Sequence, residues 1–119
     1  MTKTTDSLES LRARLAEFAA ERDWDQFHNP KNLAMALAGE AGELLEHFQW
    51  LTFEQAARLP RETRAEVALE AADVLLFLVR LCHKLGIDLA AACDKKLALN
   101  AKKYPVDKAR GRATKYTKL

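Results

Sequence analysis

The chain has 119 residues and a formal net charge of +2, from 19 Lys/Arg and 17 Asp/Glu. This length suits one ordinary domain with a hydrophobic core. No apolar run reaches the roughly 18–20 residues that a membrane-spanning helix needs, and the N-terminus lacks the apolar stretch of a signal peptide. We therefore expect a single domain over residues 1–119, located in the cytoplasm and with no membrane partner. Cys82 and Cys93 match no zinc motif, and we expect both thiols to be reduced and buried.

The charge is unevenly distributed along the chain. Residues 95–119 carry nine Lys/Arg against one acid, which is a net +8, and residues 1–94 carry a net −6. A basic tail can bind nucleic acid, bind phosphate groups or dock onto an acidic neighbouring subunit. Charge alone does not choose among these three functions.

Apolar periodicity and capping signals predict four long helices and no strand. In chain order, the predicted helices are 8–22, 30–48, 61–85 and 89–103. Their start signals are Asp6 with Glu9, Asn29 with Pro30, Pro60, and Asp88. Gly86 ends the third helix and Pro105 stops the fourth. We expect residues 1–5 to be loose and the basic tail at 106–119 to be extended.

Three further features of the helices carry structural expectations. Thr52 and Gln55 have capping-box spacing, which predicts one short helical turn in the connector at 52–59. The third helix has too many apolar residues for one narrow stripe, so it should be central and buried on several sides. Gly39 and Gly42 lie inside the second helix, where glycine is unfavourable. We interpret them as the place where another helix or a ligand approaches closely.

Two pairs of carboxylates lie inside the apolar helical patterns: Glu40 with Glu43, and Glu70 with Asp73. The i, i+3 spacing places each pair on one face of its helix. The apolar stretches around both pairs contain no Lys or Arg. Because unpaired carboxylates are costly in apolar surroundings, the four acids predict a cation bound between two packed helices. Every candidate ligand is oxygen, so we expect Mg²⁺, with Mn²⁺ as an alternative, rather than zinc.

This predicted site favours phosphate chemistry, because a hard cation held by carboxylates polarises phosphoryl oxygens. The sequence has no Gly-rich phosphate-binding loop, so basic side chains must hold the phosphates instead. The basic residues available in the last helix and the tail are Lys96, Lys103, Lys108, Arg110, Arg112 and Lys115.

Trp24, Phe27 and His28 lie in an otherwise polar loop before the second helix. Such residues either fill the core or form the wall of a pocket for a planar ligand, and the loop alone does not decide between the two. A second tryptophan, Trp50, follows the same helix. About eighteen helical residues at 1.5 Å each would separate the two tryptophans by roughly 27 Å. If both serve one pocket, one of them must come from a second subunit.

These motifs resemble the signature of the MazG-like, all-α nucleoside triphosphate pyrophosphohydrolases, a group that includes the dimeric dUTPases. Glu-x-x-Glu on one helix and Glu-x-x-Asp on the next carry this resemblance. The resemblance covers about residues 8–119, and within the family the sequence is most similar to the dCTP pyrophosphatase branch. The segments that resemble this branch are Phe18–Trp24, Gln26–His28, Pro30, Asn32–Leu33, Gly39–Glu40, Gly42–Leu44, Phe48–Trp50, Tyr104–Pro105 and Lys115–Thr117.

The resemblance implies a Mg²⁺-dependent enzyme that converts a (deoxy)pyrimidine nucleoside triphosphate, preferably dCTP or 5-modified dCTP, to the monophosphate and pyrophosphate. In this interpretation Glu40, Glu43, Glu70 and Asp73 are both metal ligands and catalytic residues. Glu43 is our candidate for taking the proton of the attacking water. The predicted substrate-binding residues are Leu15, Trp24, Asp25, Gln26, Phe27, His28, Trp50, Phe77, Lys96, Asn100, Lys103 and Tyr104.

Two of these residues depart from the family pattern. Leu15 stands where the vertebrate-like dCTP enzymes carry a histidine that contacts the nucleotide, and Phe77 stands where they carry a tyrosine. Each change removes a polar group from the expected pocket. The departures weaken the expectation of a strict cytosine preference more than they weaken that of the reaction.

We therefore predict an all-α, four-helix MazG-like bundle that forms a homodimer or homotetramer with a shared active site and a basic tail. One alternative is a dUTP or broad-range nucleoside triphosphate pyrophosphatase. Another is a non-enzymatic helical adaptor or nucleic-acid-binding protein that uses the tail. In the enzyme interpretation, the partner is a nucleoside triphosphate, and nucleic acid is not expected to be one.

Overall fold

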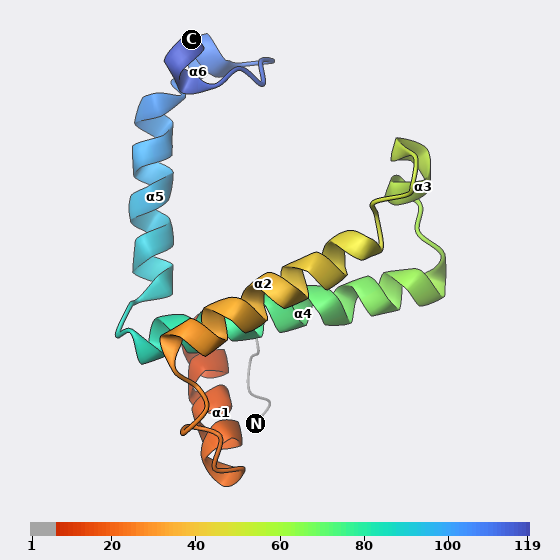
Figure 1. The fold of residues 1–119 in the computed structure, drawn as a ribbon. Coiled ribbons are helices and arrows are strands. Elements are labelled where there is room, and N and C mark those ends of the chain that lie inside the picture. The colour runs from red at the N-terminus through yellow and green to blue at the C-terminus, as the bar shows by residue number, and fades with distance from the viewer. Residues whose placement is uncertain (1–6) are drawn as a thin grey trace, which may run out of the picture. The chain divides into compact units, whose positions relative to one another are not determined.

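The structure is a computed structural model that describes residues 7–119, and every regular element in it is helical (Figure 1). The elements are α1 (Leu8–Glu21), α2 (Pro30–Glu46), α3 (Phe53–Ala57), α4 (Arg61–Lys84), α5 (Leu89–Lys103), α6 (Val106–Ala109) and the 3₁₀ helix η1 (Tyr116–Lys118). The predicted all-α class is confirmed, and the four long helices lie where the sequence places them. The expectations for residues 1–5 and for Asp6 fall outside the described residues.

The chain divides into two compact units, one ending at Ile87 and the other comprising Asp88–Leu119. Each unit is described by itself, and the packing of all four long helices into one bundle stays a prediction. Within the described residues, no helix combines the length and the hydrophobicity that crossing a bilayer requires.

Side-chain caps fix where the helices begin. Ser7 accepts a hydrogen bond from the backbone N–H of Ser10, so the first helix is capped at Ser7. Asn29 caps α2 and is followed by Pro30 in the first turn, and Asp88 caps α5, as predicted. Thr52 and Gln55 form a reciprocal capping box, which confirms the short turn expected in the connector. These local bonds satisfy backbone donors that a helix leaves free at its N-terminus.

In the first unit, α2 and α4 run side by side in opposite directions, joined by the segment that contains α3 (Figure 1). Helix α1 also packs against α4. The buried apolar side chains come from all three helices: Ala19, Leu33, Val79 and Cys82. This arrangement places the two acidic pairs on facing helices, as the sequence predicts.

Helix α4 is central in this unit, but the prediction that it is buried on several sides is wrong for the single chain. Only Val79, Arg80 and Cys82 are buried along α4, all near its C-terminal end. Leu69, one of the residues that led to the prediction, is 71% exposed. The apolar surplus of α4 therefore faces open space in this chain.

The two glycines of α2 also lack the close neighbour that we expected. A Cβ atom placed on Gly39 or on Gly42 would meet no described atom within 4 Å. Each glycine costs roughly 1 kcal/mol relative to alanine in a helix. Packing among the residues that the structure describes does not explain either of them.

The end of α4 depends on Gly86, which has a left-handed backbone with φ +68°. The Ile87 N–H donates to the Cys82 carbonyl at 2.8 Å and the Gly86 N–H donates to the His83 carbonyl at 3.1 Å, which is the Schellman pattern. The prediction that Gly86 terminates this helix is confirmed.

Gly86→Ala is expected to lower the free energy of unfolding by about 1 kcal/mol, because alanine pays a steric cost in the left-handed region that glycine does not. Chemical denaturation measures this loss. Gly86→Asn is the matched control, since asparagine tolerates the same backbone better, and it should lose less. Equal losses in the two variants would show that backbone conformation is not the cause.

The second unit corrects the prediction of an extended tail. After Tyr104, Pro105 precedes the short helix α6, and the last residues form η1. The rings of Tyr104 and Tyr116 meet edge to face with centroids 5.9 Å apart, and Lys103 Nζ lies 4.8 Å from the centre of the Tyr116 ring. Aromatic and cation–π contacts therefore hold the tail to the end of α5. The expectation of two buried thiols is also half wrong, since Cys82 is buried and Cys93 is exposed.

Candidate active site

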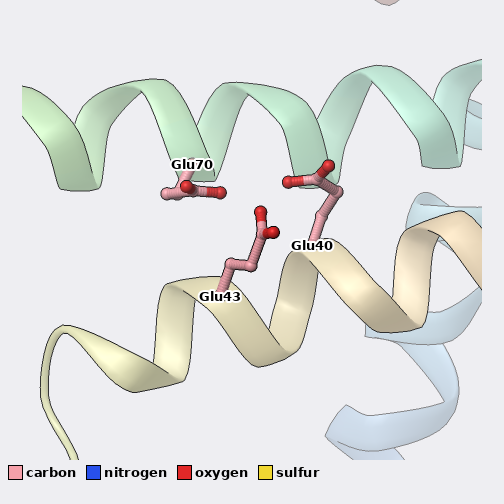
Figure 2. A group of neighbouring side chains, drawn as sticks. All are labelled: Glu40, Glu43 and Glu70. Atoms are coloured by element: carbon pink, nitrogen blue, oxygen red, sulfur yellow. The ribbon is translucent and has the colours of Figure 1, made fainter.

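Three carboxylates converge between α2 and α4. Glu40 and Glu43 come from α2 and Glu70 comes from α4, and Figure 2 shows all three side chains directed into the space between the helices. One oxygen of each lies within 4.8 Å of the others. We call these three residues the carboxylate cluster. The i, i+3 spacing on α2 brings two acids to the face that packs on α4, so three of the four predicted ligands meet as expected.

The surroundings of Glu40 disfavour its ionised form. A hydrogen-bonding contact with Glu43, then burial, then a similar contact with Glu70, and finally the charges of Glu43 and Asp73 raise the pKa of Glu40 to about 7. Oε2 of Glu40 and Oε2 of Glu70 are both buried and have no hydrogen-bond partner among the described residues. Buried oxygens without partners are costly.

These observations fit a divalent cation. The donors are all carboxylate oxygens, which suit Mg²⁺ or Mn²⁺. A cation in the carboxylate cluster would supply the partner that the two Oε2 atoms lack, and it would offset the repulsion that raises the Glu40 pKa.

The first unit contains a pocket of about 460 Å³ whose wall includes Asp73, a carboxylate that acts on Glu40 of the carboxylate cluster. Its volume is in the range of small-molecule sites. Its walls come from α1, the following loop and α4: Leu11, Arg14, Leu15, Phe18, Ala19, Trp24, His28, Asp73, Leu76, Phe77 and Arg80. Asp73 is the fourth predicted ligand, one turn along α4 from Glu70. Its side chain lines the pocket, and its charge also acts on Glu40.

Four of the predicted substrate-binding residues line this pocket: Leu15, Trp24, His28 and Phe77. The Trp24 ring meets the Phe18 ring edge to face at 5.7 Å and lies 6.1 Å from the His28 ring. The sequence left open whether the aromatic residues and the histidine of this loop fill the core or form a pocket wall, and the structure places them differently. Trp24 and His28 form a pocket wall, whereas Phe27 is 58% exposed and is not part of the pocket.

The remaining predicted substrate-binding residues of the first unit lie outside the pocket. Asp25 pairs with Arg80 and with Lys84, whose Nζ is 3.0 Å from the Asp25 carboxylate. Gln26 donates to the carbonyl and the carboxylate of Asp23, both at 3.0 Å. Trp50 is 84% exposed beyond the end of α2. None of these three side chains lines the pocket of its own chain.

The other predicted residues belong to the second unit. Lys96, Asn100 and Lys103 lie on α5, and Tyr104 caps its C-terminal end. Their approach to a bound phosphate chain stays a prediction.

The sequence interpretation missed Arg80, which is 4% exposed and lines the pocket. A signal was present, because Arg80 is the one charged residue in the apolar run Val74–Cys82. A charge in such a run needs buried partners. Arg14 was also missed. It directly precedes Leu15 and lines the pocket from α1.

Comparisons with known proteins agree with this geometry. The MazG-like family model matches residues 36–119. The chain is 49% identical to dCTP pyrophosphatase 1 of Bos taurus over 116 residues, which are 95% of this chain and 68% of the relative. It is 47% identical to dCTP pyrophosphatase 1 of Homo sapiens, with the same coverage. The crystal structure of a pyrophosphatase from Archaeoglobus fulgidus DSM 4304 superposes with a TM-score of 0.78 at 36% identity, covering 88% of this chain and 98% of that one.

The chain therefore belongs to the MazG-like family. It is an enzyme, a nucleoside triphosphate pyrophosphohydrolase. This overturns the alternative of a non-enzymatic adaptor or nucleic-acid-binding protein. The carboxylate cluster is in keeping with the divalent metals that MazG-like pyrophosphatases generally use.

The raised pKa of Glu40 predicts how pH and metal affect stability. The pKa of Glu40 is about 7 in the folded state, compared with its ordinary value of 4.5, so the folded protein binds this proton more tightly. Its contribution to stability is therefore present below about pH 4.5 and is lost as the pH rises toward about 7. Mg²⁺ should raise the Tm more at pH 8 than at pH 6, because at pH 6 the cation must displace that proton. Thermal melts with Mg²⁺ or EDTA at both pH values measure this.

Glu46→Gln on α2 is the matched control for this prediction. Glu46 is exposed and lies outside the carboxylate cluster. This variant should keep the pH-dependent Mg²⁺ effect, and Glu40→Gln should lose it. A Mg²⁺ effect that is the same at both pH values in the unmodified chain would contradict the prediction.

Proposed function

We propose that this enzyme hydrolyses a pyrimidine deoxynucleoside triphosphate, preferably dCTP or 5-modified dCTP, to the monophosphate and pyrophosphate with Mg²⁺ as cofactor. The observation that carries the proposal is the position of Asp73. This residue lines the pocket and also acts on Glu40 in the carboxylate cluster. A base in the pocket would thus have its phosphates beside the acids. The two relatives named dCTP pyrophosphatase 1 support the choice of nucleotide.

The pocket suits a planar, partly polar group. Leu15, Trp24 and Phe77 offer apolar and aromatic surface against which a pyrimidine ring can pack. His28 and Arg14 add polar groups to the same wall. A few polar groups in an apolar pocket typically fix the orientation of the ligand.

In this mechanism Glu40, Glu43, Glu70 and Asp73 would hold the divalent cation. When bound, the cation would neutralise part of the triphosphate charge and polarise the phosphoryl oxygens. The acids on both facing helices fix where the phosphates lie relative to the base. Correct placement of reacting groups is itself a large part of catalysis.

The attacking nucleophile is a water molecule, and the bond that breaks joins the α-phosphorus to the oxygen bridging to the β-phosphate. Glu43 is our candidate for the group that accepts the water proton. It is exposed, unlike the half-buried Glu40 and Glu70, and its carboxylate lies between those two in the gap between the helices (Figure 2). Water can therefore reach Glu43 more easily than the other two carboxylates.

We further propose that the functional form is a homodimer or homotetramer whose active site is shared between subunits. Several large apolar side chains of the first unit are exposed in the single chain: Met35, Leu45, Trp50 and Leu69. Gly39 and Gly42 also border open space. A second copy packing on these surfaces would explain the exposed apolar residues and would bring a partner's indole toward the pocket.

A substrate panel tests the reaction and the base preference. The intact enzyme would be incubated with Mg²⁺ and dCTP, 5-methyl-dCTP, dUTP, dTTP or dATP, and pyrophosphate release would be measured. We expect the cytosine nucleotides to give the highest kcat/KM. Release of inorganic phosphate instead of pyrophosphate would contradict the site of cleavage.

The same panel separates the alternatives within the enzyme class. A higher kcat/KM for dUTP would support the dUTP interpretation, and similar values for all five nucleotides would support a broad-range enzyme. Either result would reject the cytosine preference while leaving the reaction intact. Leu15 and Phe77 would then be the first positions to change, because both are apolar where the related enzymes are polar.

A further inference from the structure

The wall of the pocket is held by a buried arginine. Arg80 is 4% exposed and lies on α4 among apolar neighbours in the sequence. A buried charge is tolerated only when hydrogen-bonded partners surround it. The partners of Arg80 therefore show which part of the structure depends on it.

Arg80 binds two residues of the loop that carries Trp24. Its Nε–H donates to Nδ1 of His28 at 3.1 Å, and a terminal nitrogen donates to the Asp25 carboxylate. Lys84 donates to the same carboxylate oxygen of Asp25 at 3.0 Å. The hydrogen bond from Lys84 and the charge of Arg80 hold the pKa of Asp25 below its ordinary value. Arg80, which lines the pocket, thus holds this loop to α4.

A second histidine completes this polar cluster. Nδ1 of His83 lies 3.3 Å from Arg80 Nη1, and its Nε2 lies 3.1 Å from Nη1 of Arg12. Arg12 pairs in turn with Glu9. Both ring nitrogens of His83 face guanidinium groups, so a protonated ring would be repelled from both sides. Burial, and next the charge of Arg12, lower the pKa of His83 accordingly.

The contact with Arg80 also determines where His28 carries its proton. Arginine has only donors, so Nδ1 of His28 must present a lone pair to Arg80 Nε. A neutral imidazole has one N–H, which must then be on Nε2. Burial, and then the positive charge of Arg80, lower the pKa of His28, so the ring stays neutral near pH 7.

We infer that Arg80 is a positioning residue that holds His28 as its Nε2–H tautomer, so that His28 gives the bound base a hydrogen-bond donor and selects a ring edge that carries an acceptor. The inference rests on the proposed function, in which the pocket takes the base. The acceptor is a carbonyl oxygen or an unprotonated ring nitrogen, both of which cytosine has. A ring edge that offers only donors is disfavoured by this wall.

The direct test uses no substrate. Long-range ¹H–¹⁵N spectra of the intact protein distinguish a ring nitrogen with a lone pair from one with a proton, and a His28→Gln spectrum identifies the His28 signals. We expect a lone pair at Nδ1 and a proton at Nε2 in the unmodified chain. In Arg80→Met, the pKa of His28 should rise by about one unit, because a neighbouring positive charge is lost. A proton on Nδ1, or an unchanged pKa in this variant, would overturn the inference.

Kinetics with dCTP and Mg²⁺ test the consequence for binding. Arg80→Met should raise KM about tenfold with kcat within about twofold, because the contact acts on binding of the base. Arg80→Lys keeps the charge and should restore part of the loss. A fall in kcat at constant KM would contradict a positioning role through His28. Because the spectra need no turnover, they remain valid if the proposed substrate is wrong.

Variants of His28 keep the inference testable if Arg80→Met does not fold. His28→Gln retains an N–H donor, and His28→Phe retains a planar ring without one. We expect the phenylalanine variant to have a KM about tenfold above that of the glutamine variant. Equal KM values would reject the donor role. Where both substitutions fold together, Arg80→Met should add little to His28→Phe, since Arg80 acts through the ring that has been removed.

Discussion

Glu40→Gln is expected to lower dCTP turnover by more than about 100-fold. Mutation of a residue that only hydrogen-bonds to a metal ligand can already lower activity by up to about 100-fold. Glu40 has the raised pKa and one of the two buried oxygens without a partner, so a cation would depend on it strongly. Steady-state assays of pyrophosphate release at saturating Mg²⁺ would measure the loss. Asp73→Asn should act in the same direction, because Asp73 connects the pocket to the carboxylate cluster.

The same substitution should not damage the fold. In EDTA at pH 8, Glu40→Gln should melt at the same temperature as the unmodified chain or higher, because it removes one of several charges that repel each other. Glu46→Gln is the control on the same helix and should retain activity. A Glu40→Gln variant that melts well below the unmodified chain in EDTA would mean that lost turnover reflects misfolding.

Mixing Glu40→Gln with Trp50→Ala is expected to restore activity if subunits share the site, when dCTP is kept well below the KM of the Trp50→Ala variant. Trp50→Ala should raise KM by about 10- to 100-fold through lost base stacking, and Glu40→Gln should lower turnover by more than about 100-fold. In a random mixture, one site of each mixed dimer would combine intact acids from one chain with an intact Trp50 from the other. The mixture should then recover about a quarter of the unmodified activity.

This experiment discriminates between two positions of Trp50. In the single chain, Trp50 is 84% exposed and does not line the pocket that contains Trp24. If Trp50 served only its own chain, mixing would give no more than the average of the two parent variants. Refolding the two proteins together and separately provides the control for exchange of subunits.

Much of the fold could be predicted from the sequence because the signals are local. Asn29 with Pro30, Thr52 with Gln55, and Asp88 each satisfy backbone donors within their own first turn. The i, i+3 spacing places Glu40 and Glu43 on one face of α2 however the helices pack in detail, and Glu70 meets them from the facing helix. These features depend only on helix geometry and on one pair of packed helices.

The errors concern contacts between segments distant in sequence. The extended tail was wrong because the Tyr104–Tyr116 ring contact and the Lys103 contact join residues whose pairing no local pattern indicates. The contact of Asp25 with Arg80, which is 55 residues away, was likewise not foreseen, and the substrate-binding role of Asp25 stays a prediction. The burial of α4 was overestimated because apolar content does not say whether the covering surface belongs to the same chain.

The two tryptophans lie in different environments, so the intrinsic fluorescence of the protein can report on each environment separately. Trp24 lies in the pocket and Trp50 is in solvent in the single chain. A chain with Trp50→Phe would therefore emit only from the pocket, and its fluorescence should respond to nucleotide entry. A chain with Trp24→Phe would emit only from the solvent-facing indole, and its spectrum should shift to the blue when a second chain covers it. Two single-tryptophan chains can thus follow ligand binding and subunit association as separate signals in real time.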